Sequence, residues 1–249
     1  MTIISLKNIN LHFPIYGANT RSLKKRIIHV TTGGMIEYDR NEVITVHALK
    51  NINLDIQEGD RVGLIGANGA GKSTLLRVLA GIYEPTSGDL DIKGKVSALL
   101  DVMLGLDQDS SGYENMTIRG ILHGLKFHEI AQKKEEIAKF TELEDYLAMP
   151  IRTYSTGMQL RLAFAIATAV NPEIFVLDEV VGTGDAHFMH KAKERIDRLI
   201  SNSKAVILAS HDNHTIEMMC NKVIVMHAGE ILYFGETKEG LEFYQNREL

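Results

Sequence analysis

A phosphate-binding loop is the clearest chemical feature of the sequence. Residues 66–73 read Gly-Ala-Asn-Gly-Ala-Gly-Lys-Ser and fit the pattern G-x-x-x-x-G-K-[ST]. Glycines in this pattern let backbone N–H groups turn toward a phosphate chain, and the N-terminus of the following helix adds positive potential. Lys72 is expected to reach the outer phosphates and Ser73 to hold a magnesium ion. The residues predicted to line this nucleoside triphosphate site are Gly66, Asn68, Gly69, Ala70, Gly71, Lys72, Ser73 and Thr74.

The flanking residues predict the elements that such a loop requires. Residues 61–65 predict a buried strand before it, and residues 73–81 a helix after it. Further short apolar runs, typical of buried parallel strands, cover residues 173–179, 204–210 and 222–227. Because strands and helices alternate here, the sequence predicts an α/β fold with a parallel core sheet, whose ligands bind beyond the carboxyl ends of the strands.

Three polar residues follow two of these predicted strands. Asp178 and Glu179 end one strand, and His211 directly follows the next. In P-loop ATPases an aspartate at this place steadies magnesium, and the carboxylate after it orients the attacking water. Asp178 is therefore predicted to be a metal ligand and Glu179 the general base, while a histidine in the position of His211 is by itself more often structural.

A second helix start also carries polar residues. Residues 154–161 read Tyr-Ser-Thr-Gly-Met-Gln-Leu-Arg, and Thr156 with Gln159 fits a capping box. Capping alone would explain the pattern. The alternative is that Ser155, Gly157 and the N–H groups of the first turn form another phosphate site, which a head-to-tail dimer would bring to the phosphate loop of a second copy.

The remaining segments predict two additions to the core. Residues 3–13 and 48–56 alternate apolar and polar, which predicts an antiparallel β lobe. Residues 14–46 contain a basic excursion from that lobe, either a solvated loop or a docking surface for a partner or lipid headgroup. Charged helical patterns predict a helical sub-domain over about 97–165, and residues 89–97 predict a short hairpin.

Composition limits the class of protein. The 249 residues, 45% of them hydrophobic, can form one large domain over residues 1–249 or two tightly joined lobes. A single cysteine, Cys220, allows no internal disulfide and favours a reducing compartment. The net charge of −5 gives no general attraction to nucleic acid. No signal peptide is recognisable, and the apolar run 162–170 is far shorter than the roughly 20 residues that a membrane-spanning helix needs.

The order of these motifs resembles the ATP-binding subunit of an ABC transporter. In chain order they are the phosphate loop, residues 154–159, Asp178 with Glu179, residues 184–186, and His211. The resemblance implies ATP and Mg²⁺ as ligands. It also implies a homodimer in which Ser155 and Gly157 of one subunit close over ATP held by the other, Asp185 bridges the dimer, and His211 contacts the terminal phosphate.

Two positions depart from the pattern of this family. The usual glutamine between the phosphate loop and residues 154–159 has no clear match; alignment puts Asp101 there, with Gln108 nearby, so Asp101 is the candidate metal contact. The adenine-stacking aromatic of the family corresponds to Phe13, with Tyr16 and His47 as alternatives.

The finer resemblance is to polysaccharide and O-antigen exporters and to their teichoic-acid relatives. It depends on Tyr-Ser-Thr-Gly-Met at 154–158 and on residues 96–101, 112–115 and 181–188. It implies a polytopic membrane permease as partner, a lipid-linked glycan moved through that permease, and a peripheral location at the cytoplasmic face of the inner membrane. Only residues 212–249 follow His211, so the C-terminal glycan-binding domain of some members is expected to be absent.

Other functions remain open. The ATPase subunit of another ABC transporter, for teichoic acid or a different substrate, is the nearest one. A non-transport ABC ATPase acting on DNA or ribosomes belongs to another class, and it would need a long coiled coil or two cassettes in one chain. Neither pattern occurs in the sequence, and the acidic net charge also predicts no nucleic-acid partner.

Overall fold

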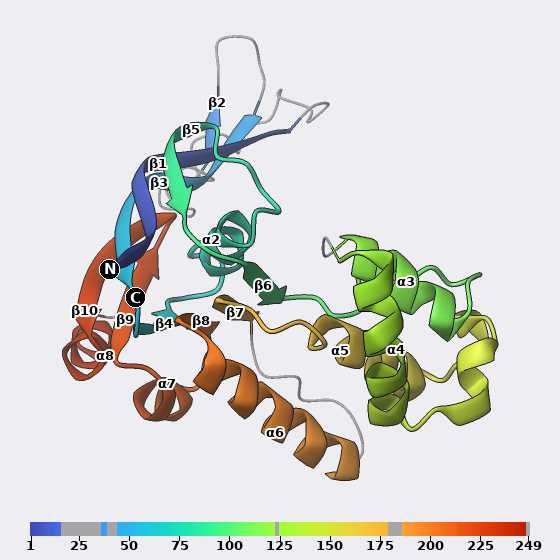
Figure 1. Ribbon diagram of the computed structural model, residues 1–249. Coiled ribbons are helices and arrows are strands. Elements are labelled where there is room, and N and C mark those ends of the chain that lie inside the picture. The colour runs from blue at the N-terminus through green and yellow to red at the C-terminus, as the bar shows by residue number, and fades with distance from the viewer. Residues whose placement is uncertain (16–35, 39–43, 123–124, 179–185, 248–249) are drawn as a thin grey trace. The chain divides into compact units, whose positions relative to one another are not determined.

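The computed structural model describes residues 1–15, 36–38, 44–122, 125–178 and 186–247 (Figure 1). The contacts between residues divide the chain into two compact units. The first unit comprises Met1–Val96, Glu173–Glu179 and Lys204–Leu249, and the second comprises Ser97–Pro172 and Val180–Ser203. The predicted helical sub-domain, about 97–165, lies within the second unit, which extends beyond it.

An antiparallel sheet forms part of the first unit. Its strands run in the order β2 (Ile36–Tyr38), β3 (Ile44–Gln57), β1 (Thr2–Ile15) and β5 (Ser87–Ile92). The apolar residues of β1 that alternate in the sequence are buried: Ile4, Leu6, Ile9 and Leu11. The predicted β lobe is therefore confirmed. Most of the predicted excursion, residues 16–35 and 39–43, lies outside the described residues.

The hairpin predicted over residues 89–97 is wrong. Strand β5 pairs antiparallel with β1, and β6 (Val96–Leu99) belongs to the other sheet. Between the two strands, the N–H of Lys93 donates to the carbonyl oxygen of Ile3 at 2.8 Å, and Gly94 has a φ of +126°. Because the chain is held against β1 and then turns away, the second half of the segment does not fold back on the first.

A mostly parallel sheet forms the core of the first unit. Its order is β10 (Glu230–Glu236), β9 (Lys222–His227), β4 (Arg61–Ile65), β8 (Ala205–Ala209) and β7 (Ile174–Asp178), followed by β6, where the chain passes into the second unit. Strand β4 pairs in parallel with β8 and β9, β7 pairs in parallel with β8, and only β10 is antiparallel to its neighbour β9 among these pairs. All residues of β8 are buried, which explains the apolar run. The parallel core is confirmed.

The described residues of the first unit include three helices. They are α2 (Lys72–Leu79), α7 (Asn213–Met219) and α8 (Thr237–Gln245). Helix α2 confirms the helix predicted over residues 73–81, apart from small differences at its ends, whereas α7 did not stand out in the sequence. Helix α2 directly follows the glycine-rich loop after β4, so the strand, loop and helix order predicted for the phosphate site is confirmed.

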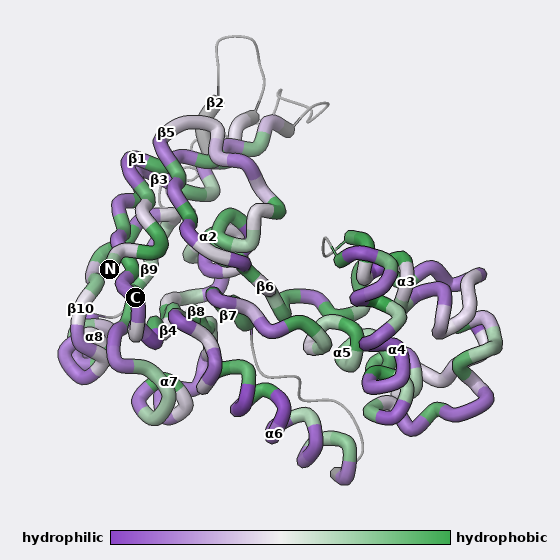
Figure 2. Tube along the Cα trace, viewed as in Figure 1, coloured by the Kyte–Doolittle hydropathy of each residue, from purple (hydrophilic) through white to green (hydrophobic). Residues whose placement is uncertain are grey.

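The second unit is helical. It contains α3 (Gly112–Leu122), α4 (Phe127–Thr141), α5 (Thr156–Ala167) and α6 (Ala186–Asn202), with 3₁₀ turns η1 (Glu144–Ala148) and η2 (Ile151–Thr153). Figure 2 shows hydrophobic and hydrophilic residues alternating along α6. Its buried residues Phe188, Ala192, Ile196 and Leu199 recur at helical spacing, so α6 buries one face.

None of the helices in the described ranges is both long and apolar enough to cross a lipid bilayer. The longest among them, α6, has 17 residues, fewer than the roughly 20 that a span requires.

Candidate nucleotide-binding site

Two glycines of the predicted phosphate loop are required by the packing of the chain itself. Gly66 has a φ of +149° and Gly71 a φ of +106°. A Cβ atom on Gly66 would lie 2.3 Å from the carbonyl oxygen of Met226, and one on Gly71 would lie 3.0 Å from the carbonyl oxygen of Ala48. Any side chain at either position would press against a backbone carbonyl oxygen, and the backbone would have to shift to make room. The fold therefore requires glycine at both positions.

Lys72 lies across the loop. Its side chain is buried, and Nζ donates to the carbonyl oxygens of Gly66 at 2.6 Å and Ala67 at 3.1 Å. Helix α2 begins at this residue, and the first N–H groups of a helix have no acceptor within it. The ammonium and the helix N-terminus thus gather positive potential at the place where the sequence predicts phosphate.

The loop is held from behind by two other strands. The N–H of Gly229 donates to the carbonyl oxygen of Ala70 at 2.9 Å, and the N–H of Lys50 donates to that of Gly229 at 2.8 Å. Gly229 lies in the turn between β9 and β10 and has a φ of +84°. The sequence shows this turn but not its contact with the loop, because the two segments lie far apart along the chain.

Strand register brings Asp178 to the same edge of the sheet as the loop. Leu64 near the end of β4 pairs with Ala209, and Ala209 pairs with Asp178. Adjacent strands lie about 4.8 Å apart, so Asp178 is about 10 Å across the sheet from the strand that leads into the loop. Its side chain is half-buried. Glu179, the predicted general base, lies outside the described residues.

His211 follows β8 at this edge, in a turn fixed on its C-terminal side. The N–H of Asp212 donates to Ser210 Oγ at 3.1 Å. The Asp212 carboxylate caps α7 by accepting the N–H groups of His214 and Thr215, both at 3.1 Å. A hydrogen bond from the Thr215 hydroxyl, followed by the backbone N–H groups, lowers the pKa of Asp212. Sequence reasoning missed this cap, although aspartate is a favoured N-cap residue.

Phe13 lies beside the segment that follows α2. Its ring meets that of Tyr83 edge-on, with centroids 5.4 Å apart at 70°. Phe13 pairs in register with Val46, two residues before Ala48, whose carbonyl oxygen lies against Gly71. Phe13 is thus near the loop through β3, and Tyr83 is an aromatic residue at this place that sequence reasoning missed.

The two alternatives to Phe13 are placed differently. His47 faces His12 on the neighbouring strand, with ring centroids 4.2 Å apart. Tyr16 lies outside the described residues.

The start of α5 is capped by Ser155. Its Oγ accepts the N–H of Met158 at 3.3 Å, whereas Thr156 is already the first residue of the helix. Gln159 donates from its side chain to the carbonyl oxygen of Ile151 at 3.2 Å. The predicted capping box of Thr156 with Gln159 is therefore wrong, because the helix begins one residue earlier than that box requires.

Gly157 has no packing reason to be glycine. Among the described residues, a Cβ atom on it would meet only Ser155 Oγ, at 3.9 Å. Glycine within a helix costs about 1 kcal/mol relative to alanine. Ser155, Gly157 and Arg161 line a hollow of about 370 Å³ in the second unit. Packing within the chain does not explain the glycine at position 157. A ligand or partner that approaches the backbone closely would explain it.

Asp101 lies in the second unit and has a local role there. Its carboxylate accepts the N–H of Met103 at 3.3 Å. Burial lowers the pKa of the nearby Arg119, which donates to the carbonyl oxygen of Val102 at 2.6 Å, and the charge of Asp101 opposes that shift. Asp185, predicted to bridge a dimer, lies outside the described residues.

Asn115 organises the loop that contains Gln108. Its side chain is fully buried; Oδ1 accepts the N–H of Asp107 at 2.8 Å, and Nδ2 donates to the carbonyl oxygens of Asp107 at 2.9 Å and Ser111 at 3.0 Å. Ser111 and Glu114 form a capping box, with Ser111 N–H to Glu114 Oε2 at 2.7 Å. The spacing Ser-x-x-Glu could have revealed this box in the sequence.

The first unit thus offers a site for a triphosphate with a hard cation. Backbone N–H groups and the Lys72 ammonium suit phosphate, and the Ser73 hydroxyl and Asp178 carboxylate supply oxygen ligands of the kind that magnesium prefers. Within the described ranges, no cluster of three or more His, Cys, Asp or Glu side chains could hold a metal ion.

Comparison with known proteins gives consistent matches. The profile of the family described as ABC transporter matches residues 49–182. An O-antigen export system ATP-binding protein, RfbE of Yersinia enterocolitica, is 45% identical over 93% of this chain and 97% of its own. The teichoic acids export ATP-binding protein TagH of Lactiplantibacillus plantarum is 34% identical over 97% of this chain and 64% of its own.

Solved structures share the fold. One described as the ATP-binding subunit of an ABC transporter has a TM-score of 0.69 at 19% identity, covering 99% of this chain and 95% of its own. Another, the dimeric ATP-binding cassette MJ0796 bound to ADP and Pi, has a TM-score of 0.67 at 22% identity, covering 94% of this chain and 98% of its own.

Proposed function

This chain belongs to the family of ATP-binding subunits of ABC transporters, and on that premise we propose that it powers export of a lipid-linked polysaccharide of the O-antigen type across the cytoplasmic membrane. Its activity is ATP hydrolysis coupled to that transport. The observation that carries the ATPase is the strand register that sets Asp178 and the phosphate loop at one edge of the sheet. The class of cargo comes from the relative named for O-antigen export, which matches over nearly its whole length.

Within the first unit, each residue has a defined task in this proposal. The loop N–H groups, from Gly66 through Thr74, and the Lys72 ammonium bind the phosphates of ATP. Ser73 and Asp178 hold Mg²⁺, which when bound neutralises phosphate charge. Phe13 stacks on the adenine. Glu179 takes the proton of the attacking water, and His211 contacts the terminal phosphate.

A composite site between two copies completes the proposal. Ser155 and Gly157 of one subunit close over ATP held by the other, and Asp185 bridges the pair. The open space around Gly157 supports this arrangement, since an incoming phosphate would need the close approach that glycine permits. Asp101 takes the place of the family's glutamine near the metal.

A polytopic permease is the proposed membrane partner, with this chain peripheral to it at the cytoplasmic face of the inner membrane. No helix in the described part of the chain could itself span the bilayer. Teichoic acid is the alternative cargo, because relatives named for its export also align with 97% of this chain, at lower identity. A net charge of −5 disfavours a nucleic-acid partner.

Affinity capture from native membranes tests the proposal. The Glu179→Gln protein should bind ATP without turnover and so hold the complex together. Capture from solubilised membranes with ATP should recover a polytopic protein and a lipid-linked polysaccharide, and the matched Lys72→Ala, Glu179→Gln protein should recover less of the glycan. A bound teichoic acid would replace the cargo, whereas ribosomes or DNA without a membrane protein would overturn the transport proposal.

A further inference from the structure

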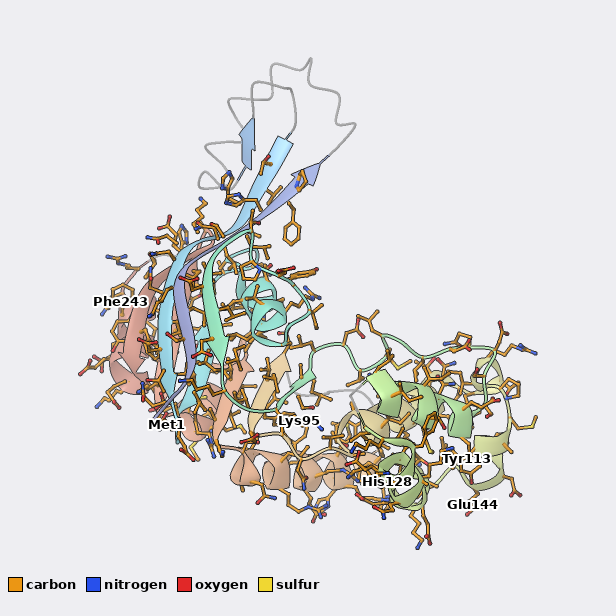
Figure 3. All side chains as sticks on the ribbon, turned by 45° about the horizontal axis from the view of Figure 1, so that its top comes forward. Met1, Lys95, Tyr113, His128, Glu144 and Phe243 are labelled. Atoms are coloured by element: carbon orange, nitrogen blue, oxygen red, sulfur yellow. The ribbon has the colours of Figure 1, made fainter. Side chains whose placement is uncertain are left out.

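One carboxylate in the second unit faces three basic side chains. Glu142 follows directly after α4, and its Oε1 accepts from Lys191 Nζ at 2.5 Å. Its Oε2 lies 3.6 Å from Arg161 Nη1 and 3.8 Å from His187 Nδ1. Figure 3 labels His128, near the start of α4, and Glu144, just beyond Glu142, so the reader can follow α4 and the residues after it between these two labels. The Glu142 hub is the name used below for Glu142, Arg161, His187 and Lys191.

The three basic side chains belong to the two helices that matter for the proposed dimer site. Arg161 lies on α5 four residues after Gly157, hence on the same face of that helix. His187 and Lys191 lie on the first turns of α6, which begins right after residues 179–185. Glu142 thus links the second turn of α5 to the first turns of α6, and it lines the same hollow as Ser155 and Gly157.

The helices α4, α5 and α6 also pack through aromatic rings. Phe140, Phe164 and Phe188, one from each helix, have ring centroids 5.7–5.9 Å apart. The Arg161 guanidinium lies over the Phe188 ring at 5.3 Å, and Lys191 Nζ lies over the Phe140 ring at 5.1 Å. The aromatic cluster supplies the apolar contact, so the Glu142 hub adds orientation to an interface that is already packed.

Local conformation gives no reason for glutamate at this position. Glu142 has a φ of +56°, and glycine or asparagine is the favoured residue in this conformation at the end of a helix. Its side chain is 41% exposed, and ion pairs at that exposure contribute little to stability. The hydrogen bond from Lys191 lowers the pKa of the Glu142 carboxyl, so the carboxylate is charged at neutral pH. A glutamate carboxylate here pairs with Arg161 of α5 and Lys191 of α6, whereas glycine has no side chain that could do so.

We propose that Glu142 is a positioning residue that sets the direction of the first turn of α5 against the start of α6, and thereby controls how readily two ATP-bound copies close. This inference rests on the proposed composite site. The N–H groups at the start of α5 must meet a phosphate held by another copy, and a misplacement of about 1 Å in such a contact can cost about 100-fold in rate. A residue that fixes α5 therefore acts on closure without touching ATP.

Matched substitutions test this role. Glu142→Gln keeps the size of the side chain, and Glu142→Gly also removes the steric cost of the left-handed backbone. Glu135→Gln is the control, because Glu135 is an exposed glutamate of α4 that pairs with Lys139 of its own helix. We expect kcat for ATP hydrolysis to fall three- to tenfold in both Glu142 variants, with ATP affinity of the monomer unchanged and the melting temperature of Glu142→Gly at or above that of wild type. Glu135→Gln should retain wild-type turnover.

A dimerisation assay in the Glu179→Gln background isolates the closing step. Adding Glu142→Gln should raise the ATP concentration needed for dimer formation about threefold or more, and Lys191→Met should have the same effect without adding to it. Wild-type turnover and dimerisation in both Glu142 variants would overturn the inference. Loss of turnover only in proportion to a lowered melting temperature would also overturn it. Ribosomes or DNA without a membrane protein in the affinity capture would refute the export proposal while leaving these measurements intact.

Discussion

The starts of α2 and α5 both combine glycine with polar residues, and the fold treats them differently. At the start of α2, Gly66 and Gly71 are required by backbone carbonyls of the same chain, and Lys72 is buried across the loop. At the start of α5, Ser155 caps the helix, but Gly157 lies in open space. Packing within the chain itself therefore accounts for the glycines of the first site. The glycine of the second site is not explained by packing within the chain, which is expected where another molecule contacts the backbone.

The largest effect should come from filling the space behind the first site. Gly66→Ala places a Cβ atom 2.3 Å from the Met226 carbonyl oxygen. We therefore expect the free energy of unfolding to fall by about 3 kcal/mol and ATP binding to be lost. Urea denaturation and nucleotide titration measure both. Gly69→Ala is the matched control, since that position has a φ of +81° but open space, and should lose only about 1–2 kcal/mol. Equal losses in the two variants would refute a steric cause.

Removing the ammonium of the first site should weaken binding without unfolding the protein. Lys72→Ala deletes the charged donor, and a hydrogen bond to a charged group contributes about 1.5–3 kcal/mol, so ATP affinity should fall about 10- to 100-fold. Calorimetric titration of the monomer provides the measurement, with Lys139→Ala on exposed α4 as control. Unchanged affinity would contradict the role given to Lys72.

Replacing the glycine of the second site should stabilise the protein, whereas replacing Gly66 of the first site should destabilise it. Gly157→Ala replaces glycine in a helix where a Cβ atom fits, so the free energy of unfolding should rise by about 0.5–1 kcal/mol. ATP affinity of the monomer should stay the same, while kcat should fall several-fold because the dimer site loses its close approach. A variant as active as wild type would remove the contrast between the two helix starts.

The smallest effect concerns pH and a third helix start. Asp212 caps α7, and its hydrogen bonds hold its pKa below the ordinary value of 3.8. A lowered pKa in the folded state means that this cap stabilises the protein above the ordinary value and loses its contribution as pH falls through the lowered pKa. Asp212→Asn should therefore flatten the decline of the melting temperature in acid below about pH 4. The neutral cap Ser155 predicts no such change for Ser155→Asn, and parallel acid profiles of wild type and Asp212→Asn would refute the assignment.

The phosphate loop and the parallel strands could be predicted from sequence because local pattern determines them. Glycine spacing fixes the turn, and strands buried on both faces must be continuously apolar, so β7, β8 and β9 were recognisable. Asp178 followed from its place at the end of such a strand.

Contacts between distant segments could not be predicted in this way. The hairpin at 89–97 failed because β5 pairs with β1, a partner that local pattern does not specify. The support of the loop by Gly229 and the approach of Lys191 to Glu142 likewise join residues far apart in the sequence. Capping at α5 was misplaced by one residue, since several polar residues there could each begin the helix and packing decides among them.

The position of Lys72 has a consequence for the thermodynamics of nucleotide capture. Its ammonium already donates to two carbonyl oxygens of the loop, at 2.6 and 3.1 Å. An arriving phosphate must therefore exchange with these carbonyls, and the measured affinity is the difference between two sets of hydrogen bonds. Such an exchange favours ligands that are dense in negative charge, because a weaker acceptor gains little over the carbonyls that it displaces. The loop carbonyl oxygens therefore compete with the ligand for the Lys72 ammonium. An anion whose charge density is too low does not displace them.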